Sequence, residues 1–449
     1  MRKLFGTDGI RGVAGESPLD PKTIYAVGLA LAHQVKASNS HPRFLLGMDT
    51  RESSNWIAAV LRAGISAGGA RVESAGVITT PAIAFLVRKH GFDAGVVISA
   101  SHNPWQDNGI KVFGGNGYKL PDEIELRIED EIFRQLENVT APDVSALSAP
   151  EVNAGFRADY EDFLRASVPD LDLDGLHLVL DCANGAASAI APELFSQLGG
   201  NIELTHVSPD GRNINANCGA LHPEVVAAET KSLGADMGVT FDGDADRALF
   251  ADAKGRVING DAVLLLAARD LLARKLLKRG LVVATTMSNM GLEAALRGDG
   301  IQMLRAPVGD KYVLERMRQE DASLGGEQSG HILFPHLATT GDGLLTALVV
   351  LDIVRRSGRP LHELVADLKV FPQVIVNVRV KEKRPLEEIA TVTSTIREAE
   401  TELAENGRVV VRYSGTEALA RVMIEAESEE AMRHHAERIA GAIREAIGV

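Results

Sequence analysis

Short runs of apolar, often β-branched residues alternate with longer amphipathic patterns along most of this 449-residue chain. Such alternation is typical of α/β layering, in which parallel strands are joined by crossover helices. In the first third of the chain it predicts strands and helices in turn, at residues 43–48, 54–68, 71–74, 81–90 and 95–99. Since a domain holds ~150 residues on average, a chain of this length is expected to form three or four of them.

The α/β pattern stops once and then starts again. A polar stretch at residues 138–154 has no sustained hydrophobic period and is predicted to be a linker. Beyond it, the pattern predicts strands at 176–180, 237–241 and 281–285 and a helix at 290–297. These restarts predict related α/β domains, although no residue-level repeat is visible and the prediction rests on the pattern alone.

The character of the chain changes after residue 370. Strands are predicted there at 374–380, 408–412 and 421–426, and helices at 385–406 and 429–447. This small α+β unit is predicted to be a separate C-terminal domain. The predicted domains are residues 1–150, 151–250, 251–369 and 370–449.

Charge balance and cysteine content exclude several classes of protein. The chain carries 47 Lys and Arg against 61 Asp and Glu, a net charge of −14, which argues against binding nucleic acid by phosphate neutralisation. Cys182 and Cys218 are too few for a disulfide framework and lack C-x-x-C spacing, so we expect a reducing, cytoplasmic location. Neither a signal peptide nor an apolar run of ~20 residues is apparent, and no membrane association is expected.

The segment VVISASHNP at residues 96–104 places a serine and a histidine at the end of a predicted buried strand. The carboxyl ends of strands form the edge at which open α/β sheets bind ligands, and Pro104 stops a helix from continuing through the turn. Ser101 is therefore a candidate for chemistry, with His102 beside it. Taken alone, the pair is also compatible with a capping serine in an ordinary loop.

The segment TFDGDADR at residues 240–247 follows another predicted strand. Asp242, Asp244 and Asp246 alternate in it, and carboxylates so close repel one another unless a hard cation lies between them. Mg²⁺ is the simplest such cation, because Arg247 and Ala253 stand where an EF-hand needs Gly and Glu. Arg247 also suits a site that receives phosphate. The alternatives are a solvated acidic turn and a phosphatase with an aspartyl nucleophile.

The segment GGEQSGH at residues 325–331 combines polar side chains with glycines. Glu327, Ser329 and His331 offer a carboxylate, a hydroxyl and an imidazole where the backbone can approach a ligand closely. This composition suits contact with a sugar ring. An ordinary glycine-rich turn is the alternative.

The segment RYSGTE begins at the end of a predicted strand and offers a nest for a dianionic phosphate. No Walker loop is present, so nucleotide binding has no support, and an ordinary loop between strands is the alternative. The candidate phosphate ligands are Arg412, Ser414, Gly415, Thr416 and Arg421.

Two further basic residues occur near these motifs. The glycine-rich opening FGTDGIRG contains Thr7 and Arg11, and Lys111 follows Ser101 closely. Most lysine side chains are exposed to solvent, so the alternative interpretation of Lys111, taken singly, is an ordinary solvated surface residue.

Taken together, FGTDGIRG, SASHNP, DGDADR, GGEQSGH and RYSGTE occur in an order that closely resembles the α-D-phosphohexomutase superfamily. The opening, the VGDKYV run at residues 308–313 and the GGEQSGH loop are most similar to the branch that acts on glucosamine phosphates. The resemblance spans nearly the whole chain. It implies three related α/β domains plus a smaller C-terminal α+β domain around a central active-site cleft.

The resemblance also implies roles for the motif residues. Ser101 would be the phosphorylated serine, and it would bind one Mg²⁺ together with Asp242, Asp244 and Asp246. Arg247 would stabilise charge on the phosphoryl group, and Lys111, His102 and Arg11 are the basic groups near Ser101, among which no proton carrier is chosen. Sugar hydroxyls would meet Glu327, Ser329 and His331, and the distal phosphate would meet Arg412, Ser414, Gly415, Thr416 and Arg421. Tyr413 and Ala418 replace two prolines of the family's last motif, so a looser loop is expected there.

The implied reaction interconverts glucosamine 6-phosphate and glucosamine 1-phosphate, and it would feed UDP-N-acetylglucosamine synthesis. It would pass through a phosphoserine enzyme, with glucosamine 1,6-bisphosphate or glucose 1,6-bisphosphate as intermediate or activator. The same chemistry on glucose or mannose phosphates is the nearest alternative, and a sugar-phosphate sensor without catalysis is a third. The expected partner is a small sugar phosphate, with neither nucleic acid nor membrane, and a homodimer is left open.

Overall fold

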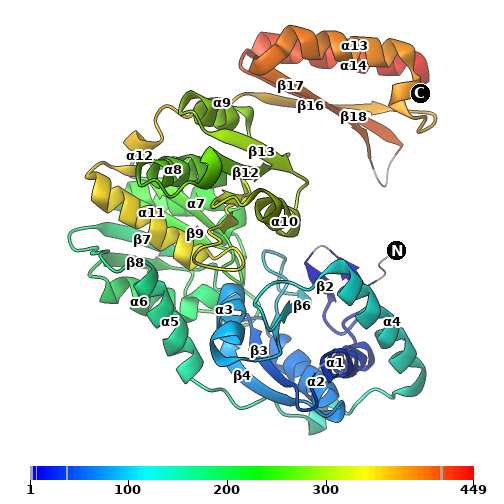
Figure 1. Cartoon of the computed structure of the whole chain (residues 1–449), viewed down its shortest axis with the longest axis vertical. Helices are drawn as coiled ribbons and strands as arrows, with labels where there is room; N and C mark the ends of the chain where they lie inside the picture. Colours follow the sequence, from blue (N-terminus) through cyan, green and yellow to red (C-terminus); the bar gives the residue numbers. More distant parts are fainter. Residues whose placement is uncertain (1–3, 7, 37–38, 415–417) are drawn as a thin grey trace. The chain divides into compact units, whose positions relative to one another are not determined.

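The computed structural model describes residues 4–6, 8–36, 39–414 and 418–449 (Figure 1). They form two compact units. The larger unit comprises Met1–Met287 and Leu304–Val365, and the smaller one comprises Ser288–Met303 and Ala366–Val449.

The first sheet of the larger unit has the strand order β1-β2-β6-β5-β3-β4. β3 pairs in parallel with β4 and β5, whereas β5–β6, β6–β2 and β2–β1 are antiparallel. The strands predicted at 43–48, 71–74 and 95–99 are β3, β4 and β5, and their parallel pairing is confirmed. The antiparallel strands were not predicted, and the loop at residues 99–106 joins β5 to β6 without a crossover helix. The strands are β1 (Phe5–Gly6), β2 (Gly9–Val13), β3 (Arg43–Met48), β4 (Arg71–Val77), β5 (Ala94–Ile98) and β6 (Asp107–Gly114).

Helices cover both faces of this sheet, with α1 and α2 on one side and α3 on the other (Figure 1). α1 and α2 cross at two glycines: a Cβ added to Gly28 would lie 2.5 Å from the Leu61 carbonyl oxygen, and one added to Gly64 would lie 2.3 Å from that of Tyr25. A larger residue at either position would push the helices apart. The helices are α1 (Pro21–Lys36), α2 (Ser54–Ala67), α3 (Thr80–His90) and α4 (Asp122–Asn138).

The second sheet has the order β11-β10-β9-β7-β8, with β7 parallel to β8 and β9 and antiparallel pairs at β9–β10 and β10–β11. The segment predicted as a linker lies between α4 and α5 and contains one short 3₁₀ helix, η1 (Val144–Ala146). The strands are β7 (His177–Asp181), β8 (Asn201–Thr205), β9 (Met237–Phe241), β10 (Ala248–Asp252) and β11 (Val257–Ile258). The helices are α5 (Gly155–Ser167), α6 (Ala191–Gln197) and α7 (Pro223–Leu233).

The third sheet has the order β13-β12-β14-β15, with β12 parallel to β14 and β14 antiparallel to β15. Its strands are β12 (Leu281–Thr285), β13 (Gln302–Ala306), β14 (Gly325–Gly326) and β15 (Ile332–Leu333). The helices of this part of the chain are α8 (Gly260–Ala273), α10 (Asp310–Glu320), α11 (Gly343–Ser357) and α12 (Leu361–Leu364). α8 and α10 contact this sheet, whereas α11 packs against α8 and the second sheet. The remaining 3₁₀ helices of this unit are η2 (Ala186–Ala189), η3 (Gly219–Leu221) and η4 (Lys278–Gly280).

The smaller unit contains a three-stranded antiparallel sheet in the order β16-β18-β17. Its elements are α9 (Met290–Gly298), β16 (Gln373–Arg379), η5 (Leu386–Glu388), α13 (Ala390–Leu403), η6 (Ala404–Asn406), β17 (Gly407–Tyr413), β18 (Leu419–Ala426) and α14 (Glu429–Ile447). α14 packs against β16 and β18, and α13 packs against α14 and β17. The strands and helices predicted after residue 370 are confirmed, with small shifts at their ends.

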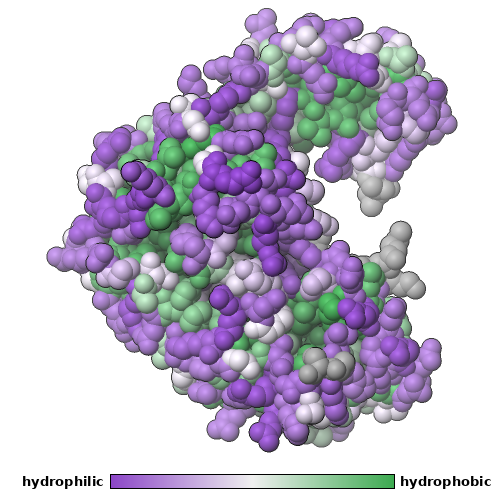
Figure 2. All heavy atoms as spheres, viewed as in Figure 1, coloured by the Kyte–Doolittle hydropathy of each residue, from purple (hydrophilic) through white to green (hydrophobic). Residues whose placement is uncertain are grey.

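Hydrophilic side chains dominate the face of the molecule seen in Figure 2, with apolar groups between them. Within the described ranges, no helix combines the length and apolar character that a membrane span requires.

Candidate active site

Ser101 lies in the loop after β5, in a backbone conformation that serine rarely adopts. Its φ is 54°, in the left-handed region, and its side chain is buried. Its amide donates a hydrogen bond of 2.9 Å to Ser99 Oγ. A non-glycine residue at positive φ costs free energy, and such strain collects at functional sites. The turn directs the hydroxyl of Ser101 into the protein rather than into solvent.

The Ser101 hydroxyl meets the acidic loop of the second sheet. Its Oγ donates a hydrogen bond of 2.6 Å to Asp242 Oδ2, and His102 Nδ1 lies 3.2 Å from the same Oγ. Asp242 directly follows β9, 141 positions along the chain from Ser101. The ends of β5 and β9 therefore bring together the two motifs that carry the strongest chemical signal in the sequence.

Asp242, Asp244 and Asp246 form a buried carboxylate cluster in which one oxygen of each lies within 4.8 Å of the others. Burial, reinforced by the charges of Asp246 and Asp244, raises the pKa of Asp242 to about 8. Asp244 Oδ1 and Asp246 Oδ1 are buried and accept no hydrogen bond from the described residues. Asp246 Oδ1 lies 3.6 Å from His331 Nδ1 and 3.8 Å from Arg247 Nε, both beyond hydrogen-bond distance. Clustered carboxylate oxygens are the donors that a hard divalent cation such as Mg²⁺ requires, so the residues fit this metal.

Lys111 lies in β6 and is almost wholly buried, with 1% of its surface exposed, which excludes the solvated role considered from the sequence. Its Nζ is 2.7 Å from Asp244 Oδ2, 2.8 Å from Asp8 Oδ2 and 3.5 Å from Asp246 Oδ2. Burial alone would lower the pKa of Lys111, but these carboxylates raise it well above its usual value. Lys111 is therefore a permanently charged group within the cluster.

A cavity of about 480 Å³ opens beside this cluster, and Arg11, His102 and Arg247 line it. Arg11 Nη2 is 2.5 Å from Asp8 Oδ2, and the Arg247 amide donates a hydrogen bond of 3.2 Å to Asp242 Oδ1. Burial, with the positive charges of Arg247 and Arg11, lowers the pKa of His102 to about 4. The imidazole of His102 is therefore neutral at pH 7 and lies between Ser101 and the cavity.

The predicted sugar loop is the turn between β14 and β15, and it contributes two residues to the same cavity, Glu327 and His331. Glu327 Oε1 accepts a hydrogen bond of 3.0 Å from the Gly309 amide. Burial would lower the pKa of His331, but the nearby carboxylates of Asp246 and Asp310 raise it to about 9. Ser329 lies in the same turn, and within the described ranges its buried Oγ has no hydrogen-bond partner.

Three residues that sequence reasoning did not select complete the charged wall of the cavity: Asp8, Lys119 and Asp310. Lys119 Nζ lies 2.5 Å from Asp8 Oδ1 and 2.6 Å from Asp310 Oδ2. Burial would raise the pKa of Asp8, but Lys111, Lys119 and Arg11 hold it well below its usual value. Asp8 and Asp310 stand inside motifs that were recognised, FGTDGIRG and VGDKYV, whereas nothing in the sequence singled out Lys119.

Four protein-family models match the chain in order, all described as phosphoglucomutase/phosphomannomutase: alpha/beta/alpha domain I at residues 2–139, domain II at 158–255, domain III at 259–371 and the C-terminal domain at 375–442. The chain belongs to the phosphoglucomutase/phosphomannomutase family.

The four family models describe three alpha/beta/alpha domains followed by a C-terminal domain. The mixed sheets with helices on their faces agree with this architecture. The predicted class, three related α/β domains plus a smaller C-terminal α+β domain, is confirmed. The exact residues at which one predicted domain passes into the next stay a prediction.

Within this family, proteins similar to this chain include phosphoglucosamine mutases. The chain is 60% identical over 454 residues to the phosphoglucosamine mutase of Koribacter versatilis, with 100% of this chain and 98% of that protein covered. It is 50% identical to the phosphoglucosamine mutase of Solibacter usitatus, with 100% and 99% covered. The resemblance seen in the GTDGIRG, VGDKYV and GGEQSGH motifs is thus confirmed by similarity along the full chain.

Solved structures of the family share the fold. A phosphoglucomutase/phosphomannomutase family protein from Burkholderia thailandensis matches with a TM-score of 0.79 at 24% identity, with 100% of both chains covered. The Aspergillus fumigatus N-acetylphosphoglucosamine mutase, solved in complex with GlcNAc-6P and magnesium, matches with a TM-score of 0.66 at 20% identity, covering 100% of this chain and 96% of that one.

The motif expected to bind the distal phosphate lies in the smaller unit, at the turn between β17 and β18. Arg412 in β17 stands directly opposite Arg421 in β18, and Ser414 follows β17 and is buried. Gly415 and Thr416 fall outside the described residues. Two arginines at facing positions repel each other, and a bound dianion would relieve this repulsion.

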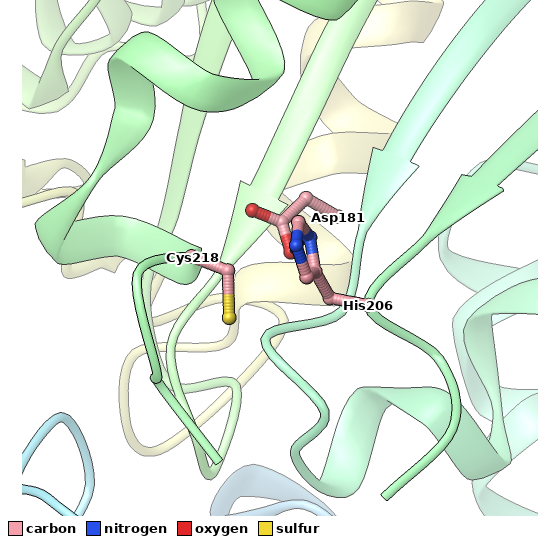
Figure 3. Close-up of side chains that lie close together, drawn as sticks. All are labelled: Asp181, His206 and Cys218. Atoms are coloured by element: carbon pink, nitrogen blue, oxygen red, sulfur yellow. Dashed lines mark ion pairs between the residues drawn. The ribbon is translucent and has the colours of Figure 1, made fainter. Parts of the chain in front are cut away.

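A second cluster, formed by Asp181, His206 and Cys218, brings together residue types that bind metals (Figure 3). His206 Nδ1 lies 3.2 Å from Asp181 Oδ1. The same carboxylate accepts hydrogen bonds from the amides of Ala183 (2.9 Å) and Gly219 (2.8 Å) and from Thr240 Oγ1 (2.9 Å). Asp181 has thus used its lone pairs to join β7 to β9 and to two loops, and we assign the cluster a structural role.

Proposed function

We propose that the chain is a phosphoglucosamine mutase, which interconverts glucosamine 6-phosphate and glucosamine 1-phosphate through a phosphoserine at Ser101. The observation that carries the proposal is the 2.6 Å hydrogen bond from Ser101 Oγ to Asp242, which joins a strained serine to a buried carboxylate cluster. The family relatives that carry this name, from K. versatilis and S. usitatus, match over the whole chain.

The proposed reaction consists of two phosphoryl transfers. In the first, the bond between phosphorus and Ser101 Oγ breaks, a bond forms to O1 of glucosamine 6-phosphate, and the O1 proton leaves. The product is glucosamine 1,6-bisphosphate. After this intermediate turns around, its 6-phosphoryl group returns to Ser101 Oγ, and O6 regains a proton. The enzyme ends phosphorylated, as it began.

In such transfers the protein contributes alignment and charge rather than covalent chemistry. Ser101, Asp242, Asp244 and Asp246 would hold one Mg²⁺, which when bound neutralises charge on the transferring phosphoryl group. Arg247 lines the cavity beside these carboxylates and would pair with the same phosphoryl oxygens.

The three basic groups near Ser101 differ in what they can do. Lys111 is buried among carboxylates and stays charged, so its contribution is electrostatic. Arg11 is paired with Asp8. Of the three, His102 is the neutral group that lines the cavity. Its lowered pKa makes it a weak base, so it would relay the proton of an attacking sugar hydroxyl rather than hold it.

The rest of the substrate would be bound by the two remaining motifs. Sugar hydroxyls would meet Glu327 and His331, which line the cavity, and Ser329 of the same turn. The phosphate that is not being transferred would meet Arg412, Ser414, Gly415, Thr416 and Arg421. Because the bisphosphate must turn around, this second phosphate site has to release and rebind, and a separate C-terminal unit suits that task.

Ser101 must be phosphorylated before the first turnover, so an activating bisphosphate is part of the proposed function. Glucosamine 1,6-bisphosphate or glucose 1,6-bisphosphate would load Ser101, and a relative from A. fumigatus has been solved with glucose1,6bisphosphate. The small-molecule partner is a sugar phosphate. A homodimer and a cytoplasmic location stay predictions.

The proposed activity is tested by following conversion of glucosamine 6-phosphate, glucose 6-phosphate and mannose 6-phosphate in parallel, with Mg²⁺ and the bisphosphate present. We expect the glucosamine compound to have the highest kcat/KM. A clear preference for glucose or mannose phosphate would change the proposed substrate but leave the proposed phosphoryl-transfer mechanism in place. Binding of all three without conversion of any would contradict the proposal.

A further inference from the structure

Arg51 lies in the loop between β3 and α2, beneath the loop that carries Ser101, and its side chain has no solvent exposure. An arginine has five N–H donors, and every one of them is used here. Nε donates to Asp49 Oδ2 at 2.8 Å. Nη1 donates to the carbonyl oxygens of Asp107 (2.9 Å) and Pro104, and Nη2 to those of Ser101 (2.9 Å) and Asn103 (2.8 Å).

The same guanidinium also reaches the amide side of Ser101, through two intermediate residues. Asp49 Oδ2, which accepts from Arg51, also accepts a hydrogen bond of 2.6 Å from Ser99 Oγ. Ser99 Oγ in turn accepts the Ser101 amide at 2.9 Å. Both the N–H and the C=O of the reactive serine are therefore fixed by one buried network centred on Arg51.

A residue from the second sheet's loops supports the same carbonyl groups. Asn215 Nδ2 donates to the carbonyl oxygens of Ser101 (2.9 Å) and Asn103 (3.1 Å), the two acceptors that Arg51 Nη2 also uses. Close packing reinforces this arrangement, because a Cβ added to Gly243 would lie 2.4 Å from the Ser101 carbonyl oxygen. The loop is thus held from two sides in the position that gives Ser101 its φ of 54°.

The guanidinium fork is essential to this geometry. A lysine would keep the charge but has three donors on one nitrogen, so it cannot reach four carbonyl groups and a carboxylate at once. Without the fork, the loop would relax toward the negative φ that serine prefers. That relaxation would rotate Oγ away from Asp242 and the carboxylate cluster.

We infer that Arg51 is a positioning residue for phosphoryl transfer: it contacts no substrate but fixes the backbone of Ser101 so that Oγ points at the Asp242 cluster. The inference rests on the proposed function of Ser101 as the phosphoryl carrier. Transfer needs near-attack geometry, and a displacement of ~1 Å can cost ~10²-fold in rate. Binding of the sugar phosphate should not depend on Arg51, because the cavity wall does not include it.

The test compares Arg51→Lys and Arg51→Ala with the control pair Arg62→Lys and Arg62→Ala. Arg62 is an arginine of α2 whose described bond is one contact of 3.3 Å to the Ser148 carbonyl oxygen. Each protein is phosphorylated with glucose 1,6-bisphosphate, and the rate of phosphoryl transfer to glucosamine 6-phosphate is measured in a single turnover by rapid quench. The Kd for glucosamine 6-phosphate and the thermal midpoint are measured on the same samples.

We expect both Arg51 variants to lose ~10²-fold in transfer rate while their Kd stays within about threefold of wild type and the Arg62 variants keep both values. Guanidinium ion at millimolar concentration should partly restore the rate of Arg51→Ala, but not of Arg51→Lys, whose side chain fills the space. A folded Arg51→Lys with the wild-type rate, or equal losses in rate and in binding, would overturn the inference.

If the Arg51 variants do not fold, Asn215→Ala supplies the second test, because Asn215 shares two of the same acceptors. A fall in transfer rate with unchanged Kd would support the inference, and an unchanged rate would overturn it. The wild-type transfer rate separates this inference from the proposed function. Its absence would overturn both, whereas a normal wild-type rate with a normal rate in Arg51→Lys would overturn the positioning role alone.

Discussion

Lys111 Nζ lies 2.7 Å from Asp244 Oδ2, and both side chains are excluded from solvent. The two residues stand 133 positions apart, one in β6 of the first sheet and the other in the loop after β9 of the second. A buried charge is tolerated only with a partner, so each of these residues makes the other's position possible. The contact joins the serine side of the site to the carboxylate side.

Replacing Lys111 with methionine removes the buried cation and leaves Asp8, Asp244 and Asp246 without it. Removing one partner of a buried pair costs ~3–5 kcal/mol, and we expect the free energy of unfolding to fall by that amount in the absence of divalent cations. The loss should shrink when Mg²⁺ is added. Urea denaturation checks this, with Lys254→Met, at an exposed lysine, as the control. A loss no larger than that of the control would contradict the pairing.

The carboxylate cluster predicts that divalent cations stabilise the protein as well as activate it. A ligand that binds the folded state alone adds ~2.7 kcal/mol at a concentration 100 times its Kd. We expect Mg²⁺ to raise the thermal midpoint of the wild type and to do so far less in Asp244→Asn, while EDTA removes activity reversibly. Asp170→Asn, at an exposed residue, should respond like the wild type. Equal stabilisation of Asp244→Asn would place the cation elsewhere.

The pair of His206 and Asp181 predicts a pH-dependent contribution to stability. A hydrogen bond from His206 to Asp181, together with the charge of that carboxylate, raises the pKa of His206. Its stabilising effect is complete below the unfolded value of ~6.5 and is lost as the pH rises through the folded value. His206→Gln should therefore destabilise the protein more at pH 6 than at pH 9. Denaturation across this range checks the difference, and exposed His434→Gln is the control.

Arg412 and Arg421, which face each other in the smaller unit, are predicted to bind the phosphate that is not transferred. Losing one of them should therefore weaken substrate binding without preventing phosphorylation of Ser101. A hydrogen bond to a charged group contributes ~1.5–3 kcal/mol, so Arg421→Ala should weaken binding of glucosamine 6-phosphate by about 10- to 100-fold. Phosphorylation of Ser101 by the bisphosphate should persist, because Ser101 lies in the larger unit. Calorimetric titration of the phosphoenzyme measures the Kd, with exposed Arg433→Ala as the control. An unchanged Kd would move the distal phosphate to other residues.

Much of the fold could be predicted from the sequence, because hydrophobic period and strand length carried a clear signal. The strands β3, β9 and β12 and the helix α14 occur at the predicted residues. The antiparallel parts of the first sheet could not be predicted in this way. Their strands β2 and β6 are short or polar, and the direction of a strand depends on its partners rather than on its own residues.

The candidate site could be predicted as far as its motifs extended. Ser101 and the Asp242 cluster were selected because their residue types and spacing imply a chemistry. Lys119 was not, because a lysine looks solvated until its partners are known, and those are Asp8 and Asp310 from distant segments. Arg51 was not selected for a related reason. Four of its five acceptors are backbone carbonyl groups, and any residue type supplies a backbone carbonyl, so the sequence does not indicate these partners.

The central claim is that Ser101 carries the phosphoryl group. Substituting Ser101 with alanine tests that claim by mutagenesis. Ser101→Ala should fold normally, accept no phosphate from glucose 1,6-bisphosphate and lose nearly all mutase activity, because it removes the hydroxyl that lies 2.6 Å from Asp242 Oδ2. Exposed Ser148→Ala serves as the matched control and should keep full activity. Substantial turnover by a folded Ser101→Ala protein would assign the chemistry to another residue.

The most direct measurement is intact mass with peptide mapping, taken on the wild-type protein after incubation with glucose 1,6-bisphosphate and again after glucosamine 6-phosphate. The account predicts one phosphoryl group on Ser101 after the first step and its removal by the sugar phosphate in the second. A protein that gains no phosphoryl group, or one that carries it on Asp242 or Asp244, would contradict the account.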